Sequence, residues 1–173
     1  MQVGLSSQTP VAMRISSRAH YGLRMMTELA KAYGGPPLSL TEIARRESMP
    51  LAYLEQLVAP LRRAGVVDGT RGLHGGYRLA REPRDVTVLE IVELLEGPVA
   101  PVECLAEDYQ PGSCSREPEC LSRPLWARLQ QAFKEVLGGT TLADMMHDPG
   151  MVEPECPVAS LPPHHELRQP AGV

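Results

Sequence analysis

Apolar residues recur at intervals of three and four along residues 14–33, a spacing that places them on one face of a helix. Residues 34–37, Gly-Gly-Pro-Pro, follow this pattern and are expected to end the helix, because both residue types break helices. Ser39 and Glu42 then have the spacing of a capping box, in which each side chain accepts a hydrogen bond from the other's backbone amide. The pattern predicts a long helix followed by a short one that ends near Glu47.

A third helix is predicted over residues 51–64, where leucines return at helical spacing and Gly65 supplies a stop. Pro60 lies inside this segment, and we expect it to kink the helix or end its regular part early, because an interior proline costs about 3 kcal/mol. Two short apolar segments, at 66–67 and 77–79, then flank a glycine-rich tip. This arrangement predicts a β-hairpin.

The second half of the chain is predicted to hold further helices around a loop. Thr87 opens a helix with a second capping box, and residues 97–120 form a loop rich in glycine, proline, cysteine and acidic side chains. Pro124 suits the first turn of a long amphipathic helix, and a short helix follows from about Thr140. The fold class is thus mainly α with a small β-hairpin wing: a winged helix-turn-helix plus a long dimerisation helix.

Composition divides the chain into four segments. They are a disordered extension (1–12), a winged helix-turn-helix DNA-binding domain (13–85), a cysteine loop with dimerisation helices (86–147) and a disordered tail (148–173). The patterned part opens at Met13, which is an alternative start to Met1. No apolar run approaches the roughly 18 residues of a membrane span and no signal-peptide pattern is present, so a cytoplasmic protein is expected.

The net charge of −4 conceals a separation of charge along the chain. Residues 14–85 hold 12 basic and 7 acidic side chains, whereas residues 86–173 hold 5 basic and 14 acidic ones. A basic front half suits a polyanionic partner such as DNA, although charge separation of this size is also common in proteins that bind no nucleic acid. Charge favours nucleic acid binding without establishing it.

The predicted order of short helix, turn, second helix and hairpin is that of a winged helix-turn-helix, whose second helix enters the major groove. Glutamine can bridge an adenine edge and glutamate can accept from a cytosine amine. The candidate base readers on that helix are Ala52, Tyr53, Glu55 and Gln56. The candidate cations for phosphate or minor-groove contacts are Arg62, Arg63, Arg71, His74 and Arg78. The alternative is that Glu55 and Gln56 form only a solvated helix face.

Three stretches of the chain resemble the IscR/NsrR group of bacterial winged-helix regulators, the Rrf2 family. They are residues 13–24 (MRISSRAHYGLR), residues 53–67 (in YLEQL and LRRAGVV) and the wing at 71–79 (RGLHGGYRL). The resemblance extends from Met13 to about Met146 and implies a homodimeric transcription factor, usually a repressor, that binds double-stranded DNA. Many members of the family hold an iron–sulfur cluster. Pro60 and the N-terminal extension depart from the family pattern.

Cys104, Cys114 and Cys120 fall in the predicted loop, and clustered cysteines in an intracellular protein point to metal or redox chemistry. Thiolates suit iron–sulfur clusters and zinc equally, and no Cys-x-x-Cys spacing separates the two. The residues alone therefore leave a cluster, zinc or incidental thiols open. The resemblance places these cysteines where cluster-binding members hold a [2Fe–2S] or [4Fe–4S] cluster.

Three thiolates leave a tetrahedral iron one ligand short. In IscR-type members a histidine three residues beyond the last cysteine completes the set, but this chain has Arg123 there, which does not ligate iron. In NsrR-type members the ligand comes from the first helix of the other subunit, at the position of His20 in this chain. The resemblance thus points to His20 of the partner subunit; Cys156, an exogenous ligand, or a merely solvated His20 are the alternatives.

The main hypothesis is a DNA-binding transcription regulator, expected to be a repressor, that senses iron–sulfur status, redox state or nitric oxide through a cysteine-ligated cluster. The alternative is a zinc-stapled winged-helix interaction module without a DNA or redox function. An enzyme is not expected, because the sequence holds no nucleophile–base motif, phosphate loop or two-histidine metalloprotease pattern.

Overall fold

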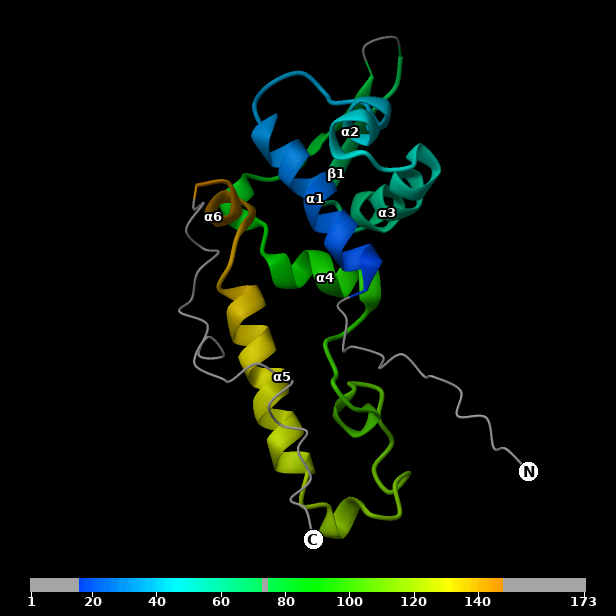
Figure 1. The fold of residues 1–173 in the computed structure, drawn as a ribbon, viewed down its shortest axis with the longest axis vertical. Coiled ribbons are helices and arrows are strands. Elements are labelled where there is room, and N and C mark those ends of the chain that lie inside the picture. Colours follow the sequence, from blue (N-terminus) through cyan, green and yellow to red (C-terminus); the bar gives the residue numbers. More distant parts are fainter. Residues whose placement is uncertain (1–15, 73–74, 148–173) are drawn as a thin grey trace, which may run out of the picture.

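The computed structural model describes residues 16–72 and 75–147, which form a helical protein with a two-stranded antiparallel hairpin (Figure 1). The elements are α1 (Ser17–Lys31), α2 (Leu40–Glu47), α3 (Leu51–Arg63), β1 (Val67–Thr70), β2 (Gly76–Leu79), α4 (Val88–Glu96), α5 (Arg123–Gly138) and α6 (Leu142–His147). The hairpin pairs Val67 with Leu79 and Thr70 with Gly76. The predicted fold class, mainly α with a β-hairpin wing, is confirmed. None of the described helices is long and apolar enough to cross a membrane.

The hydroxyl caps predicted at two helix starts are present, but the reciprocal half of each capping box is not. The Ser39 hydroxyl accepts from the Glu42 amide at 3.1 Å, and the Thr87 hydroxyl accepts from the Glu90 amide at 3.2 Å. The Glu42 carboxylate instead accepts from Arg46 Nε at 2.8 Å, and the Glu90 carboxylate also binds an arginine. A charge-assisted bond to arginine is stronger than a bond to a neutral backbone amide, so the two carboxylates bind arginines instead. The prediction that they accept from the backbone amides of Ser39 and Thr87 was therefore wrong.

Helix α3 does not end early at Pro60, so this part of the expectation was wrong, and the kink at Pro60 stays a prediction. The helix continues to Arg63, and the Ala64 amide donates to the Pro60 carbonyl at 3.0 Å. Pro60 lies in the last turn, where its missing N–H removes one helical hydrogen bond, and Leu61 beyond it is fully buried. Gly65, with φ of +72°, ends the helix as predicted.

Helix α1 lies at the centre of the molecule and packs against α3, α4, α6 and β2 (Figure 1). The core comprises buried side chains of α1 and of each of these neighbours: Met25, Met26 and Leu29 of α1, Leu54, Leu57 and Leu61 of α3, Leu79 of β2, Ile91 of α4 and Leu142 of α6. The chain before α6 returns to the start of α4, where the Val88 amide donates to the Thr140 carbonyl at 2.8 Å. Helices α4 and α6 therefore share one core with the helix-turn-helix.

Helix α5 and the loop before it extend away from this core (Figure 1). No residue of α5 is buried in the single chain. Leu125 and Val136 of this helix are 59% and 67% exposed, and Leu121 just before it is 95% exposed. A helix whose apolar stripe is exposed in the described part of the single chain is suited to contact a further surface.

Candidate functional site

The exposed face of α3 carries most of the predicted base readers. Leu54 and Leu57 are fully buried against the core, and Ala52, Glu55 and Gln56 on the other side are exposed. This division follows from the helical period, because residues three and four apart share a face. The structure thus presents these three predicted readers together on one exposed face of α3.

Tyr53 differs from the other predicted readers, because it is half-buried and packs against α1. Its ring meets that of Tyr21 edge-on, with centroids 5.8 Å apart and planes at 89°. Its hydroxyl lies 3.5 Å from the Ser17 hydroxyl. Tyr53 therefore joins the reading helix to α1, a role that the sequence analysis missed; its contact with DNA stays a prediction.

Several arginines of the helix-turn-helix and wing are paired with acidic side chains. The pairs are Arg24 with Glu47, Arg45 and Arg46 with Glu42, Arg81 with Glu90 and Arg84 with Glu82. Within residues 16–72 and 75–147, by contrast, Arg62, Arg63 and Arg71 have no acidic partner, and all three are exposed. Unpaired positive charge is thus left at the end of α3 and in the wing, where DNA contacts are predicted.

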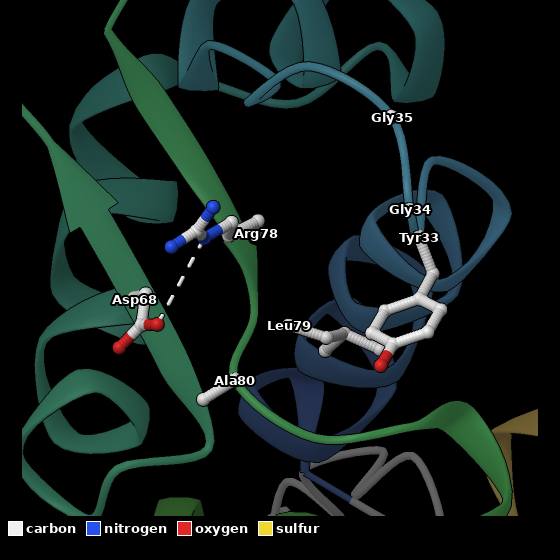
Figure 2. Close-up of a pocket in the computed structure, with 7 residues that line it drawn as sticks. All are labelled: Tyr33, Gly34, Gly35, Asp68, Arg78, Leu79 and Ala80. Atoms are coloured by element: carbon white, nitrogen blue, oxygen red, sulfur yellow. Dashed lines mark ion pairs between the residues drawn. The ribbon is translucent and has the colours of Figure 1, made fainter.

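Arg78 and Asp68 face each other across the wing, as the paired residues of β2 and β1 (Figure 2). Arg78 Nε lies 3.8 Å from Asp68 Oδ2, and both side chains are more than half exposed. They line one side of a cavity of about 340 Å³, and the Tyr33 ring lies on the other side, toward α1. The sequence analysis missed Asp68, which hairpin register could have placed beside Arg78. His74, the remaining predicted cation, lies outside the described residues.

The three loop cysteines line two different cavities in the single chain. Cys104 and Cys114 share a cavity of about 320 Å³ with Tyr109, and Cys120 lines a cavity of about 470 Å³ with Arg123. In the part of the chain that the structure describes, no three histidine, cysteine, aspartate or glutamate side chains are close enough to share a metal ion. The loop therefore places two thiols in one cavity and the third in another.

A hydrogen-bonded network fixes the loop around Cys114. The Glu117 carboxylate accepts from the Gly112 amide at 2.7 Å and from the Tyr109 hydroxyl at 2.9 Å. The bond from the Gly112 amide, followed by that from Tyr109, lowers the pKa of Glu117. The Tyr109 hydroxyl in turn accepts from the Cys114 amide at 3.2 Å. Neither Glu117 nor Tyr109 could be recognised from spacing, because the bonds depend on how the loop turns.

Cys120 lies just before α5, beside Ser122 and Arg123. The Ser122 hydroxyl, 3.4 Å from Cys120 Sγ, lowers the pKa of this thiol, and the Arg123 amide adds to the effect. A thiol that ionises more easily is a better ligand for a soft metal centre.

Arg123 occupies the position at which the resemblance to IscR-type members implies a histidine. It lines the cavity of Cys120, and its guanidinium reaches the backbone of Cys104. Its Nη2 donates to the Cys104 carbonyl at 3.4 Å, whereas its Nε is buried and has no acceptor among residues 16–72 and 75–147. A buried cationic donor beside a thiol suits an anionic occupant, and a cluster bound by thiolates is anionic. The donor types present, three thiols and one cation, suit a thiolate-bound cluster, but the described residues of one chain do not bring the three thiols close enough to share a metal.

His20 is exposed on α1 and belongs to no metal-binding group with the loop cysteines in the described residues of one chain. Its ring lies 5.2 Å from that of Tyr21. Ligation by His20 of the partner subunit stays a prediction. Cys156, the rival ligand, lies outside the described residues.

Sequence comparison finds regulators of transcription over nearly the whole described region. A family model described as an iron-dependent transcriptional regulator, Rrf2, matches residues 15–148. The HTH-type transcriptional regulator CymR of Bacillus subtilis is 47% identical over 133 residues, which cover 77% of this chain and 89% of that protein. The HTH-type transcriptional regulator IscR of Vibrio campbellii is 30% identical over 141 residues, 82% of each chain.

This chain also has the fold of solved structures of such regulators. CymR, the global cysteine regulator of B. subtilis, superposes with a TM-score of 0.62 over 77% of this chain and 95% of its own, at 47% identity. The IscR protein of T. potens superposes with a TM-score of 0.63 over 90% of this chain and 97% of its own, at 35% identity.

Proposed function

This chain belongs to the Rrf2 family of transcriptional regulators, and we propose that it is a homodimeric repressor whose cysteine loop holds an iron–sulfur cluster. It is a DNA-binding transcription regulator and not an enzyme. The observation that carries the proposal is the distribution of unpaired groups. Arg62, Arg63 and Arg71, which have no acidic partner among the described residues, lie at the end of α3 and in the wing, and the buried Arg123 Nε, which has no acceptor among them, belongs to a side chain that lines the cavity of Cys120.

DNA reading in this proposal divides between α3 and the wing. Glu55 and Gln56 project from α3 toward base edges in the major groove, while Arg62 and Arg71 bind phosphate or the minor groove. Arg62 lies against the wing at Gly69: a Cβ atom added to this glycine would be 3.5 Å from Arg62 Cδ. A dimer places its two reading helices in half-sites about 34 Å apart.

Asp68 weakens DNA binding in this arrangement, because its carboxylate lies beside Arg78 and repels phosphate. Asp68→Asn should therefore tighten binding by about twofold to fivefold, the size expected for one exposed charge. Fluorescence anisotropy with a labelled duplex measures the change. Asp108→Asn removes the same charge from the cysteine loop and is the matched control; equal tightening in both variants would contradict a local effect of Asp68.

The exposed stripe of α5 is proposed to pack against the same helix of a second copy. Leu125, Phe133 and Val136 are spaced by eight and three residues and lie on one face. The resemblance to the family implies a homodimer, and a long helix with an exposed apolar face would supply the contact.

Val136→Glu should separate the dimer, because it places a charge in the apolar contact. We expect the dissociation constant of the dimer to rise by about tenfold or more, measured by analytical ultracentrifugation. Gln131→Glu adds the same charge on the opposite side of α5 and should leave the dimer intact. A Val136→Glu protein as dimeric as the wild type would remove this face from the interface.

The sensor in this proposal is the cysteine loop. Cys104, Cys114 and Cys120 hold the group, Arg123 Nε balances its negative charge, and His20 of the partner subunit is the proposed fourth ligand. An iron–sulfur cluster supplies a centre that responds to redox change and to the loss of iron. The loop joins the end of α4 to the start of α5, so a change in its shape acts on both the core and the dimer helix.

One experiment tests the proposal as a whole. The full chain is purified without oxygen, its iron and sulfide are counted, and its affinity for a duplex selected from random-sequence DNA is compared before and after removal of iron by a chelator. We expect a brown protein with iron and sulfide and a selected site whose affinity depends on them. A colourless protein that contains zinc and selects no DNA site would establish the zinc-stapled interaction module instead.

A further inference from the structure

The first turn of α1 is held by the end of α4. Glu96 Oε1 accepts from the Ala19 amide at 2.9 Å and from the Ser16 hydroxyl, and Arg18 Nε donates to the Leu95 carbonyl at 3.1 Å. The first amides of a helix lack partners within the helix, and negative charge is favoured at this end. The Glu96 carboxylate therefore completes the start of α1 from a position 77 residues away from Ala19.

Glu96 is also the last residue of α4 before the chain turns toward the cysteine loop. Gly97 follows it with φ of +92°, a conformation that favours glycine and ends the helix. One turn along α1, a Cβ on Gly22 would lie 2.1 Å from Leu95 Cδ1, so the two helices touch at this glycine. A displacement of the loop at Gly97 thus acts first on Glu96 and on its contact with α1.

The same part of α1 contacts the reading helix. Ser17 and Tyr21 both meet Tyr53, through the 3.5 Å approach of the two hydroxyls and the edge-on contact of the rings. Tyr53 is followed after one residue by Glu55 and Gln56, the proposed base readers. Figure 1 shows the start of α1 beside α4 and α3 together.

We propose that Glu96 is a positioning residue for the DNA-reading helix: it fixes the first turn of α1, and α1 fixes the start of α3 through Tyr53. The inference rests on the proposed DNA-binding function of α3. It adds a defined route by which the cysteine loop reaches the base readers, through one carboxylate and one pair of aromatic rings.

A first test needs no DNA. The full chain, which has five tyrosines, is labelled with 3-fluorotyrosine, and the Tyr53 resonance in the fluorine NMR spectrum is assigned with Tyr53→Phe. Glu96→Ala should shift or broaden this resonance. Glu96→Gln keeps an oxygen that accepts both hydrogen bonds and should leave the resonance in place.

Glu93→Ala is the matched control, because Glu93 is on the same helix and its carboxylate makes no hydrogen bond within the described residues. It should leave the Tyr53 resonance in place. An unmoved Tyr53 resonance in a Glu96→Ala protein with wild-type circular dichroism overturns the proposal, and so does an equal shift in Glu93→Ala.

A second test measures affinity for the duplex that the wild-type protein selects. Glu96→Ala should weaken binding by about tenfold, and Glu96→Gln should restore it to within about twofold of the wild type. In a Tyr53→Leu background, Glu96→Ala should cause little further loss, because the route is already broken. If Glu96→Ala weakens DNA binding by the same factor in the Tyr53→Leu background as in the wild type, the route through Tyr53 is overturned.

The two tests separate the inference from the proposed function. If the wild-type chain selects no DNA site, the proposed function fails, and the fluorine spectrum still decides whether Glu96 positions α3. If the wild type selects a site and Glu96→Ala binds it equally well, the function stands and the positioning role is lost.

Discussion

Replacing Cys104 by alanine should yield a colourless protein without an iron–sulfur cluster, whereas replacing His20 should weaken or alter the cluster and keep the protein folded. Cys104 is half-buried and shares a cavity with Cys114, so Cys104→Ala removes one of the three proposed thiolate ligands and keeps the backbone carbonyl that Arg123 contacts. His20 is an exposed side chain of α1, and its removal disturbs no core contact. The two variants therefore separate a ligand of the loop from the proposed ligand of the partner subunit.

The measurements are the visible absorbance and the iron and sulfide content of protein purified without oxygen, with circular dichroism to confirm the fold. Cys156→Ala is the third variant, because it removes the thiol that competes with His20 for the fourth position. An unchanged spectrum and iron content in His20→Ala would defeat the assignment of His20. A spectrum changed only by Cys156→Ala would transfer the role to the tail.

Replacing Gln56 by alanine should cost about 1–3 kcal/mol at the selected site and change the sequence that the protein prefers. Replacing Arg62 should weaken binding to all sequences alike, because a phosphate contact carries no sequence information. The slope of the logarithm of the binding constant against the logarithm of the salt concentration should become shallower by about one unit. The difference follows from the positions of the two side chains, one on the exposed face of α3 and one at its end against the wing.

Anisotropy titrations on the selected duplex and on a scrambled duplex, at several salt concentrations, measure both effects. Gln131→Ala and Arg128→Ala make the same two substitutions on exposed positions of α5 and should leave both affinities unchanged. Equal losses on the two duplexes for Gln56→Ala would remove this residue from the base readers. A loss confined to the selected duplex for Arg62→Ala would instead make the arginine a reader.

The elements of this fold could be predicted closely because their signals are local. The hydroxyls of Ser39 and Thr87 act on amides three residues away, and Gly65 ends its helix by its own backbone conformation. The prediction that α3 ends early at Pro60 was wrong because this proline lies in the last turn, not in the middle of the helix. Burial of Leu61, the next residue, favours continuing the helix past it. The reciprocal carboxylates of the capping boxes were wrong because arginines compete for them.

The sequence by itself determined the order of the helices and the wing, the exposed face of α3 and the presence of three cysteines in one loop. Only the tertiary structure decided which charges stay unpaired, that Tyr53 faces α1, and that Glu96 completes the first turn of that helix. It also decided that two thiols share one cavity and the third lines another. The physical reason is the separation of the partners along the chain: Arg24 and Glu47 are 23 residues apart, Ser17 and Tyr53 are 36, and Ser16 and Glu96 are 80. Helical and strand periods relate residues a few positions apart, so contacts over these distances are fixed only when the whole core packs.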